Sequence, residues 1–364
     1  MGLRNRHWVC GANVELDFFK GVCKVKRMMQ WALGLAAAIA IAAPVAAQTT
    51  LNFSNWIPPY APFVQDALLV WGKQVDDATA GRVKVRLLPK AVTSPPQHFD
   101  AVRDGLADVT FIVHGYTPGR FVMTKAAEMP FFGDSAVSTS VAYQRVYDRT
   151  LAKADEHKGV KVLSVFTHGP GAMFIARKTV SSIKDLNGLK FRTSGGVVHE
   201  VGNALGVSGM MKPATEVFEM FNSGVADAAF FACESILTFK LAGLVKQAVI
   251  VPGGIFNVSF SLIMNEGKFN ALSPADRQAI MKVSGESFAR LAGQSFDSSD
   301  RKALVLLNEN KALVTTASPE FVGELRKATQ PVIDGWITQA REKGIDGQAA
   351  LEALRAEVKK VASE

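Results

Sequence analysis

The sequence has little cysteine and no familiar catalytic motif. Of its three cysteines, Cys10 and Cys23 precede the apolar run described below, so Cys233 stands alone in the rest of the chain and can form no disulfide within it. There is no Gly-x-Ser-x-Gly elbow, no Walker loop, no His-Glu-x-x-His and no Cys/His group at metal-binding spacing. The six histidines are scattered singly. We therefore expect a protein that is not an enzyme, has no cofactor and has no metal-binding motif, and the sequence leaves open whether a metal ion assists binding.

The sequence also lacks a hydrophobic run long enough to cross a bilayer. The run from Trp31 to Ala43 is shorter than the roughly 20 residues that a spanning helix needs. Basic residues (Lys24, Lys26, Arg27) precede it and small residues (Val45, Ala46, Ala47) follow it, which is the order of a cleaved secretion signal. We predict cleavage after Ala47, a periplasmic mature protein and no integral membrane segment. Met28 and Met29 are alternative start sites, and the sequence leaves open whether residues 1–26 are translated.

Charge of one sign is not concentrated anywhere. The formal net charge is +8, but residues 1–47 contain six basic and two acidic residues, so the remainder has a net charge of +4. Its basic residues alternate with acidic ones and form no stripe interleaved with aromatics, which disfavours nucleic acid as a partner. With 48% apolar residues over 364 positions, the chain is long enough to bury more than one core.

From Leu51 onward, strand-like and helix-like segments alternate, which is typical of an α/β fold with a largely parallel sheet. Ser273, Pro274 and Asp276 have the order of a helix N-terminus, and we expect a long helical region from there towards Asn310. The Gly169–Gly171 stretch contains two glycines around a proline and is a candidate hinge. The expected strands are 51–55, 83–87, 109–113, 160–166, one after Gly171 that ends at Ala176, 189–192, 209–212, 225–231 and 258–264.

One short pattern occurs twice. Gly105-Leu-Ala-Asp108 and Gly224-Val-Ala-Asp227 each follow a helical segment and open an expected strand. Two lobes built on one plan, each with its own sheet, would produce this repetition. The alternative is that Gly-apolar-Ala-Asp is simply a common way to leave a helix and enter a strand.

Arg192 is the strongest candidate for a binding residue. It ends an expected strand and is followed by Thr193, Ser194 and two glycines that lead into a helix. Ligands of open α/β sheets bind beyond the carboxyl ends of the strands, and free amides at a helix start attract anions. A guanidinium can hold a carboxylate through two parallel hydrogen bonds. The pattern therefore predicts a carboxylate site, although a strand-terminal arginine is often only one partner of a surface ion pair.

Other strand ends add candidates to the same site. The strand over 109–113 is followed by His114 and Tyr116, and the strand over 225–231 ends at Phe231, with Glu234 three residues later. Trp56 follows the first strand and could form an aromatic wall opposite Phe231. Each aromatic residue could equally pack in a core.

At this point the sequence resembles the substrate-binding proteins of tripartite ATP-independent periplasmic (TRAP) transporters, of the DctP type. The resemblance spans the chain from Leu51 to the C-terminal helices, and Ile183–Arg192 (IKDLNGLKFR) is its most specific segment. The other matching segments are Gly81–Val85, the Pro-Pro-Gln run ending at Gln97, Ala101–Asp108, Glu128–Phe132, Pro213–Phe218 and Asn265–Pro274.

The resemblance implies an α/β, two-lobed periplasmic binding protein fold with hinge strands and a long helix bracing both lobes. It implies lobe I over 48–168, lobe II over 169–257, and a return to lobe I with the bracing and C-terminal helices over 258–364. The partners would be an organic acid and the small and large TRAP membrane subunits. In the family, the arginine that matches Arg192 pairs with the ligand carboxylate. The expected ligand-binding residues are Arg192, Phe231, Glu234, Trp56, His114, Tyr116, Thr193 and Gln97.

This sequence departs from the family pattern in two places. Gly169–Gly171 stands where some members have a second basic residue, which disfavours a sialic-acid-like ligand. Phe231-Ala-Cys-Glu234 stands where a Phe-Pro-Trp-Glu segment is expected. Two rival functions remain: a binding protein of an ATP-driven importer or a sensor kinase, and a secreted enzyme using Glu234 and His114 as acid and base.

Overall fold

Two β-sheets form the framework of the protein. The computed structural model describes residues 48–364, so the leader expected over residues 1–47 lies outside the described residues. The first sheet has the order β2-β1-β3-β10-β4 and the second the order β11-β9-β5-β8-β6-β7. The strands are β1 Thr49–Ser54, β2 Val83–Leu87, β3 Val109–Val113, β4 Val160–Thr167, β5 Ala172–Ile175, β6 Lys190–Thr193, β7 Ser208–Met211, β8 Ala228–Phe231, β9 Gln247–Ile250, β10 Ser259–Asn265 and β11 Leu313–Thr316.

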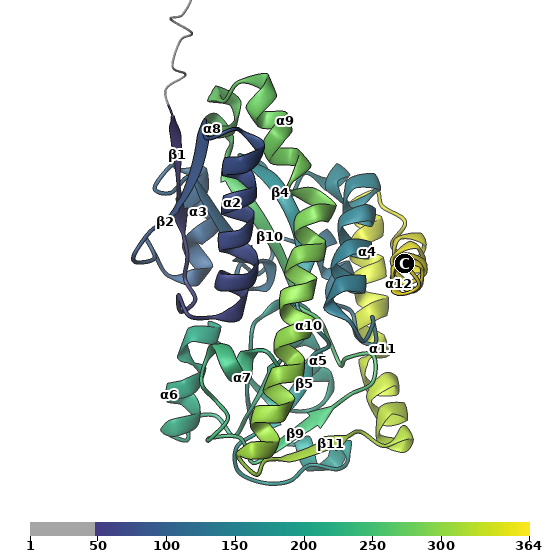
Figure 1. Ribbon diagram of the computed structural model, residues 1–364. Coiled ribbons are helices and arrows are strands. Elements are labelled where there is room, and N and C mark those ends of the chain that lie inside the picture. The colour runs from purple at the N-terminus through teal and green to yellow at the C-terminus, as the bar shows by residue number, and fades with distance from the viewer. Residues whose placement is uncertain (1–47) are drawn as a thin grey trace, which may run out of the picture. The chain divides into compact units, whose positions relative to one another are not determined.

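Helices connect the strands and cover the sheets (Figure 1). The α-helices are α2 Leu69–Ala78, α3 His98–Arg103, α4 Ala136–Arg149, α5 Gly196–Ala204, α6 Val217–Asn222, α7 Ser235–Thr238, α8 Glu266–Ala271, α9 Pro274–Lys282, α10 Gly285–Glu309, α11 Pro319–Glu342 and α12 Gly347–Ala362. A π-helical turn, η1 Val64–Leu68, precedes α2. The 3-10 turns are η2 Pro95–Gln97, η3 His114–Tyr116, η4 Met123–Glu128, η5 Leu151–Ala154, η6 Ile183–Leu186 and η7 Ala214–Glu216.

The chain changes sheet three times: between β4 and β5, between β9 and β10, and through α10 between β10 and β11. The first two crossing segments are hydrogen-bonded to each other: Gly171 N donates to Phe256 O at 2.9 Å, and Ile255 N donates to Gly171 O at 3.0 Å. The expected two-lobed α/β fold with crossing strands is thus confirmed. The lobe boundaries at 168/169 and 257/258 fall within these crossings but stay a prediction. Strand β11 pairs with β9 in the second sheet, so the segment after 258 does not return wholly to the first lobe.

Helix α10 extends along both lobes, as Figure 1 shows. Its first half packs on the first sheet, where the rings of Phe63 and Phe296 stack with centroids 4.8 Å apart. Its second half lies against α7, where the Asp300 carboxylate accepts a hydrogen bond from the Glu234 backbone at 2.6 Å. Ala303 and Leu307 of this half are also buried in the apolar core of the second lobe, so the bracing helix is held by apolar packing in both lobes.

The helical region expected from Pro274 towards Asn310 is interrupted. Helix α9 ends at Lys282 and α10 begins at Gly285, which has a φ of 52°. Between them the Ser284 hydroxyl accepts a hydrogen bond from the Trp71 indole nitrogen at 3.1 Å. The left-handed backbone at Gly285 and this tertiary hydrogen bond interrupt the helix. The helical spacing of apolar residues continues through this point, so the sequence pattern did not indicate the break.

The repeated Gly-x-Ala-Asp pattern has the same structure in both lobes. Gly105 and Gly224 both have positive φ, 81° and 75°. The Asp108 carboxylate accepts from Asn52 N in β1 at 2.8 Å, and the Asp227 carboxylate accepts from Lys190 N in β6 at 3.1 Å. Each aspartate therefore ties the start of a central strand to its parallel neighbour, and the two lobes share this local plan.

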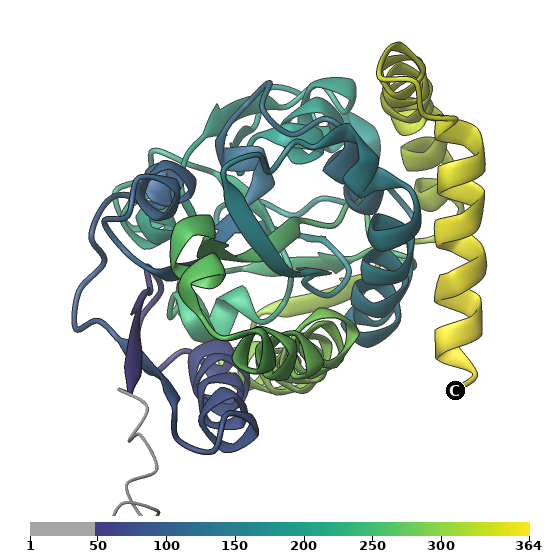
Figure 2. The ribbon, with the colours of Figure 1, turned by 90° about the horizontal axis from the view of Figure 1, so that it is seen from above.

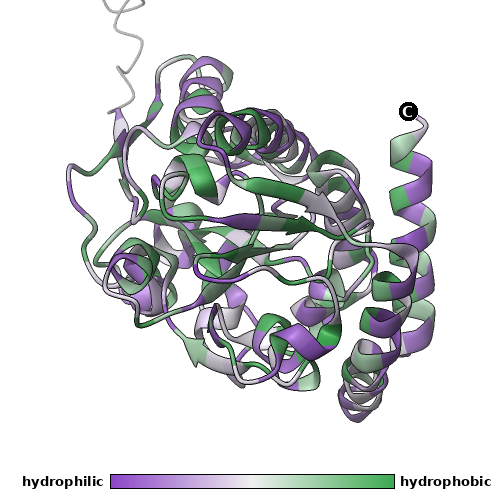
Figure 3. Cartoon of the chain, turned by 90° about the horizontal axis from the view of Figure 1, so that it is seen from below, coloured by the Kyte–Doolittle hydropathy of each residue, from purple (hydrophilic) through white to green (hydrophobic). Residues whose placement is uncertain are grey.

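The C-terminal helices lie on one side of the sheets. Helix α12 packs along α4 (Figure 2), and Figure 3 shows that it carries both apolar and polar residues. Trp336 of α11 is buried and donates from its indole nitrogen to Val122 O at 2.8 Å. Among the helices of residues 48–364, none combines the length and apolarity needed to span a membrane.

Candidate functional site

Arg192 lies at the end of β6 and is almost completely buried, with 1% of its surface exposed. Its Nε donates to Lys212 O at 2.8 Å, and one terminal nitrogen, Nη2, lies 3.4 Å from the Tyr116 hydroxyl. The guanidinium carbon lies 4.3 Å from the centre of the Phe231 ring. Within residues 48–364 no carboxylate forms an ion pair with it. The backbone and two aromatic side chains therefore orient Arg192 without neutralising it.

Burial of this unpaired cation is energetically costly. Desolvation lowers the pKa of Arg192, and the neighbouring Tyr116 and Glu216 only partly oppose that effect. A guanidinium nevertheless stays charged in proteins, so the site keeps a positive charge in a poorly hydrated environment. An anion that entered the site would supply the missing counter-charge.

Tyr116 connects the first lobe to this cation. Its hydroxyl oxygen accepts from Ala214 N at 2.9 Å and faces Arg192, and both of those partners belong to the second lobe. Because these partners are donors, the hydroxyl hydrogen of Tyr116 remains available to a ligand. Arg192 and Tyr116 can thus donate together to one carboxylate.

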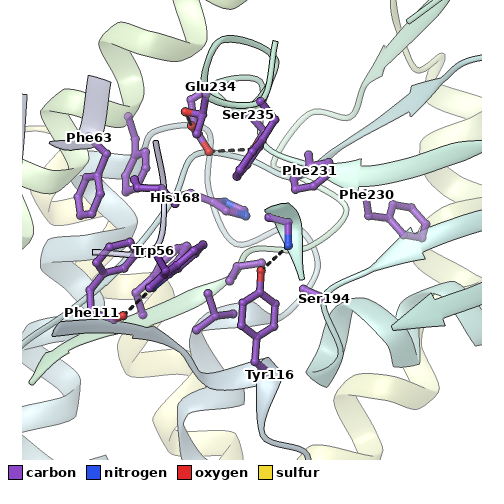
Figure 4. Close-up of a pocket in the computed structure, with 18 of the residues that line it drawn as sticks. Trp56, Phe63, Phe111, Tyr116, His168, Ser194, Phe230, Phe231, Glu234 and Ser235 are labelled. Atoms are coloured by element: carbon purple, nitrogen blue, oxygen red, sulfur yellow. Dashed lines mark hydrogen bonds between the residues drawn. The ribbon is translucent and has the colours of Figure 1, made fainter. Parts of the chain in front are cut away.

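An aromatic cavity opens beside Arg192 (Figure 4). Its volume is about 60 Å³, which is several times the space that one water molecule requires. The Trp56 ring is fixed by a hydrogen bond from its Nε1 to Phe111 O at 2.9 Å. The cavity is lined by Trp56, Ile57, Phe63, Phe111, Val113, Tyr116, His168, Arg192, Ser194, Ala214, Phe230, Phe231, Glu234, Ser235, Thr238, Phe239, Val258, Phe260 and Phe296. This lining suits a compact, flat and largely apolar ligand with one anionic group.

Glu234 lies at the edge of the cavity near α7, and its carboxyl group is already occupied by hydrogen bonds. Ser235 Oγ donates to one oxygen at 2.8 Å and Thr238 Oγ1 to the other at 2.7 Å. Burial raises the pKa of Glu234, and the buried Asp300 beside it has its pKa raised by burial and by the Glu234 charge. These groups form a self-satisfied polar cluster that helps to shape the cavity.

The start of α5 is not open to a ligand, contrary to the expectation from the glycines after Arg192. Val197 N donates to Glu128 Oε2 at 3.2 Å, while Glu128 Oε1 accepts from Ser259 Oγ at 2.7 Å. A carboxylate of the first lobe therefore already occupies the anion-attracting end of this helix. No local pattern indicates this contact, because Glu128 is distant from both partners along the chain.

The structure brings five of the eight expected residues to the cavity, namely Trp56, Tyr116, Arg192, Phe231 and Glu234. Thr193, His114 and Gln97 do not line it. Thr193 Oγ1 faces His199 Nδ1 at 3.3 Å because neighbouring residues of a strand point to opposite faces. The structure therefore gives no support to Thr193, His114 and Gln97 as ligand-binding residues.

His114 and Gln97 are placed elsewhere for different reasons. His114 is buried between Ser259 and His157, each 2.9 Å from one of its ring nitrogens. The Gln97 side chain is exposed and accepts from the Thr93 hydroxyl. His114 and Glu234 line different cavities, so the acid and base pair of the rival enzyme hypothesis is not assembled.

His168 is the main cavity residue that the sequence did not indicate. It follows β4 directly and is 4% exposed. The rule that ligands bind at strand ends applies to it as well as to Arg192, but the adjacent Gly169–Gly171 stretch suggested only a hinge. The many phenylalanines of the cavity, among 23 in the chain, were indistinguishable from ordinary core residues.

Comparison with known proteins decides the family. The model of "Bacterial extracellular solute-binding protein, family 7" (DctP) matches residues 53–339, most of the chain. The chain belongs to this family. Among curated relatives of this family-7 protein is "Outer membrane transporter protein TsaT" of Comamonas testosteroni, which is 29% identical over 88% of this chain and 96% of the relative.

Solved structures of family-7 relatives have the same fold. A TRAP periplasmic solute-binding protein from Bordetella bronchiseptica with bound (R)- and (S)-mandelate is 44% identical, with a TM-score of 0.84 over 86% of this chain and 99% of the other. A marine-metagenome TRAP solute-binding protein specific for aromatic acids, in complex with 3-hydroxybenzoate, is 32% identical. Its TM-score is 0.81, with the same coverage of both chains.

Proposed function

We propose that this family-7 protein captures a small aromatic monocarboxylate between its lobes and delivers it to the small and large membrane subunits of a TRAP transporter. The observation that carries this proposal is the buried guanidinium of Arg192, which has no carboxylate partner within residues 48–364. A ligand carboxylate would pair with Arg192 and accept a hydrogen bond from Tyr116, since both groups have free donors.

The cavity supports a monocarboxylate with an aromatic tail. Arg192 is the sole cationic side chain among the described residues that line it. A second carboxylate would therefore be buried without a counter-charge, at a cost of several kcal/mol. The rings of Trp56 and Phe231 offer flat apolar walls beside the cation. The mandelate and 3-hydroxybenzoate of the two solved relatives are ligands of this chemical type.

The remaining parts of the proposal concern location and chemistry. We infer that residues 1–47 include a signal peptide cleaved after Ala47, and that the mature protein is periplasmic and soluble. We further infer that it catalyses no reaction and needs no cofactor. A binding protein of an ATP-driven importer would have the same two-lobed architecture. The two solved relatives are TRAP solute-binding proteins, which favours a TRAP transporter as the partner of this protein.

Calorimetric titration of the mature protein with benzoate, mandelate, 3-hydroxybenzoate and citrate tests the proposal. We expect at least one aromatic monocarboxylate to bind with micromolar or tighter affinity, and citrate not to bind. Arg192→Ala should weaken that binding by at least about 30-fold, because truncating one partner of a buried charge pair costs about 2–5 kcal/mol.

Two further variants distinguish an effect on the ligand site from an effect on the fold. Tyr116→Phe should weaken binding by about 10-fold, since it removes one hydrogen bond to a charged group. Tyr60→Phe, an exposed tyrosine outside the cavity, should change nothing. Unchanged affinity in Arg192→Ala would refute the assignment of the site.

A further inference from the structure

His168 presents an unused hydrogen-bond acceptor to the cavity. Its Nδ1 lies 2.6 Å from Gly169 O. A carbonyl oxygen can only accept, so Nδ1 must carry the hydrogen. In the neutral ring the other nitrogen, Nε2, is then a bare acceptor. Within residues 48–364 no group donates a hydrogen bond to it.

The surroundings of His168 keep the ring neutral. Burial lowers its pKa to about 4, and the charge of Arg192 acts in the same direction. The rings of Phe256 and Phe260 meet it edge to face, with centroids 6.0 and 5.9 Å away. These contacts fix the plane of the imidazole, so Nε2 has a defined direction. Figure 4 shows the ring extending into the cavity in the region between Trp56 and Phe231.

Three of the four hydroxyls that line the cavity have hydrogen-bond partners within residues 48–364, and the fourth, that of Ser194, has none. The hydroxyls of Ser235 and Thr238 donate to Glu234, and the Tyr116 oxygen accepts from Ala214 N. His168 Nε2 can only accept, so it differs from these hydroxyls as a fixed acceptor that has no donor among the described residues. A ligand that donates a hydrogen bond to such a buried acceptor binds more tightly than a ligand that leaves it without a donor.

We propose that His168 selects for a hydroxyl group on the bound acid, so that the preferred ligand is a hydroxylated aromatic monocarboxylate. This inference rests on the proposed function. The hydroxyl donates its hydrogen to His168 Nε2 while the carboxylate pairs with Arg192. A keto group in the same place offers only lone pairs, which the lone pair of Nε2 repels, and an unsubstituted acid leaves Nε2 without a donor.

Two matched pairs of acids test this: mandelate with phenylacetate, and 3-hydroxybenzoate with benzoate. The members of each pair differ only by the hydroxyl. Phenylglyoxylate adds the keto form of mandelate. Calorimetry on the wild-type protein should show at least one hydroxy acid binding about 10-fold or more tightly than its unsubstituted partner, and phenylglyoxylate binding more weakly than mandelate.

Variants of His168 assign the preference to this side chain. His168→Phe retains an aromatic ring without the acceptor, and should reduce the preference to less than about 3-fold by weakening the hydroxy acid more than the unsubstituted acid. His168→Gln retains an acceptor oxygen and should keep part of the preference. Circular dichroism and thermal unfolding check that both variants fold.

The possible failures are distinguishable. If the wild-type protein binds none of the acids, the proposed function itself fails. If it binds them without preference in either pair, only the role of His168 is overturned. Equal weakening of both members of a pair in His168→Phe would also overturn it, because the residue would then act through packing alone.

Discussion

The Glu128 side chain of the first lobe accepts a hydrogen bond from the backbone nitrogen of Val197 in the second lobe, at 3.2 Å. Its other carboxyl oxygen is bound by Ser259, whose hydroxyl also contacts His114. A buried polar chain thus reaches from His114 through Ser259 and Glu128 to the start of α5. These contacts join the lobes outside the aromatic cavity, so they can hold the closed arrangement without touching the ligand.

The folding stability contributed by Glu128 should fall as the pH rises. Burial raises the pKa of Glu128 to about 7, above its usual value near 4.5. The folded protein therefore binds this proton more tightly than the unfolded chain, and the resulting stability is complete below about pH 4.5 and lost as the pH approaches 7. At about 1.4 kcal/mol per pKa unit, the change amounts to about 3 kcal/mol.

Chemical denaturation of the wild type and Glu128→Gln at pH 5 and pH 8 measures this. The glutamine side chain of the variant cannot ionise, so only the wild type should lose this stability as the pH rises. The free energy of unfolding of the variant minus that of the wild type should therefore increase by up to about 3 kcal/mol from pH 5 to pH 8. Glu219→Gln makes the same substitution at an exposed position and should show no such change. A pH-independent difference between wild type and Glu128→Gln would contradict the expectation.

Closure of the lobes should depend on glycine at position 195. Gly195 has a φ of 83°, and a Cβ placed there would collide with the carbonyl oxygen of Gly115 in the first lobe. Gly195→Ala should therefore disfavour the closed state and weaken acid binding by about 10-fold or more, because the affinity falls with the population of the binding-competent state. Calorimetry measures the affinity, and small-angle scattering with saturating ligand measures closure.

Gly188→Ala is the control for backbone strain. Gly188 also has a positive φ, 73°, but a Cβ there would meet no atom within 4 Å. Both variants should lose about 1 kcal/mol of stability from the left-handed backbone. Only Gly195→Ala should lose affinity, and equal losses in the two variants would argue against the steric explanation.

Local sequence patterns predicted much of the fold. Alternation of strand and helix signals indicated the α/β class, and the repeated Gly-x-Ala-Asp pattern indicated two related lobes because its aspartates act on neighbouring backbone. The pairing of β11 with β9 was not predictable. The residues of a short strand do not indicate which sheet it joins. The sheet that β11 joins depends on where the preceding helix α10, which is 25 residues long, ends.

The candidate site was predictable where it depended on strand ends and not where it depended on side-chain direction. Arg192 lies at the end of β6 and Tyr116 follows β3, both strands end at the interlobe cavity, and the sequence indicated both residues. His114 also follows a strand, but the η3 turn directs it toward His157. Glu128 was missed because its partners lie 69 and 131 residues away along the chain. Only tertiary packing brings such groups together.

Asp297 of the bracing helix should stabilise α4 of the first lobe. Its carboxylate accepts from the Ser135 hydroxyl at 2.6 Å, from Ala136 N at 2.6 Å and from Val137 N at 3.2 Å. It thus satisfies free amides at the start of α4 and places a negative charge at the positive end of that helix. A side chain of one helix here caps another, which ties α10 to α4 by polar contacts in addition to their packing.

Asp297→Ala should lower the free energy of unfolding by about 1–2 kcal/mol, the usual cost of losing a helix cap. The melting temperature should fall by a few degrees. Asp334→Ala removes an exposed aspartate in α11 and should have little effect. Because Asp297 does not line the aromatic cavity, acid binding measured well below the melting temperature should be unchanged in both variants. A loss of affinity in Asp297→Ala would instead show that α10 transmits strain from α4 to the ligand site.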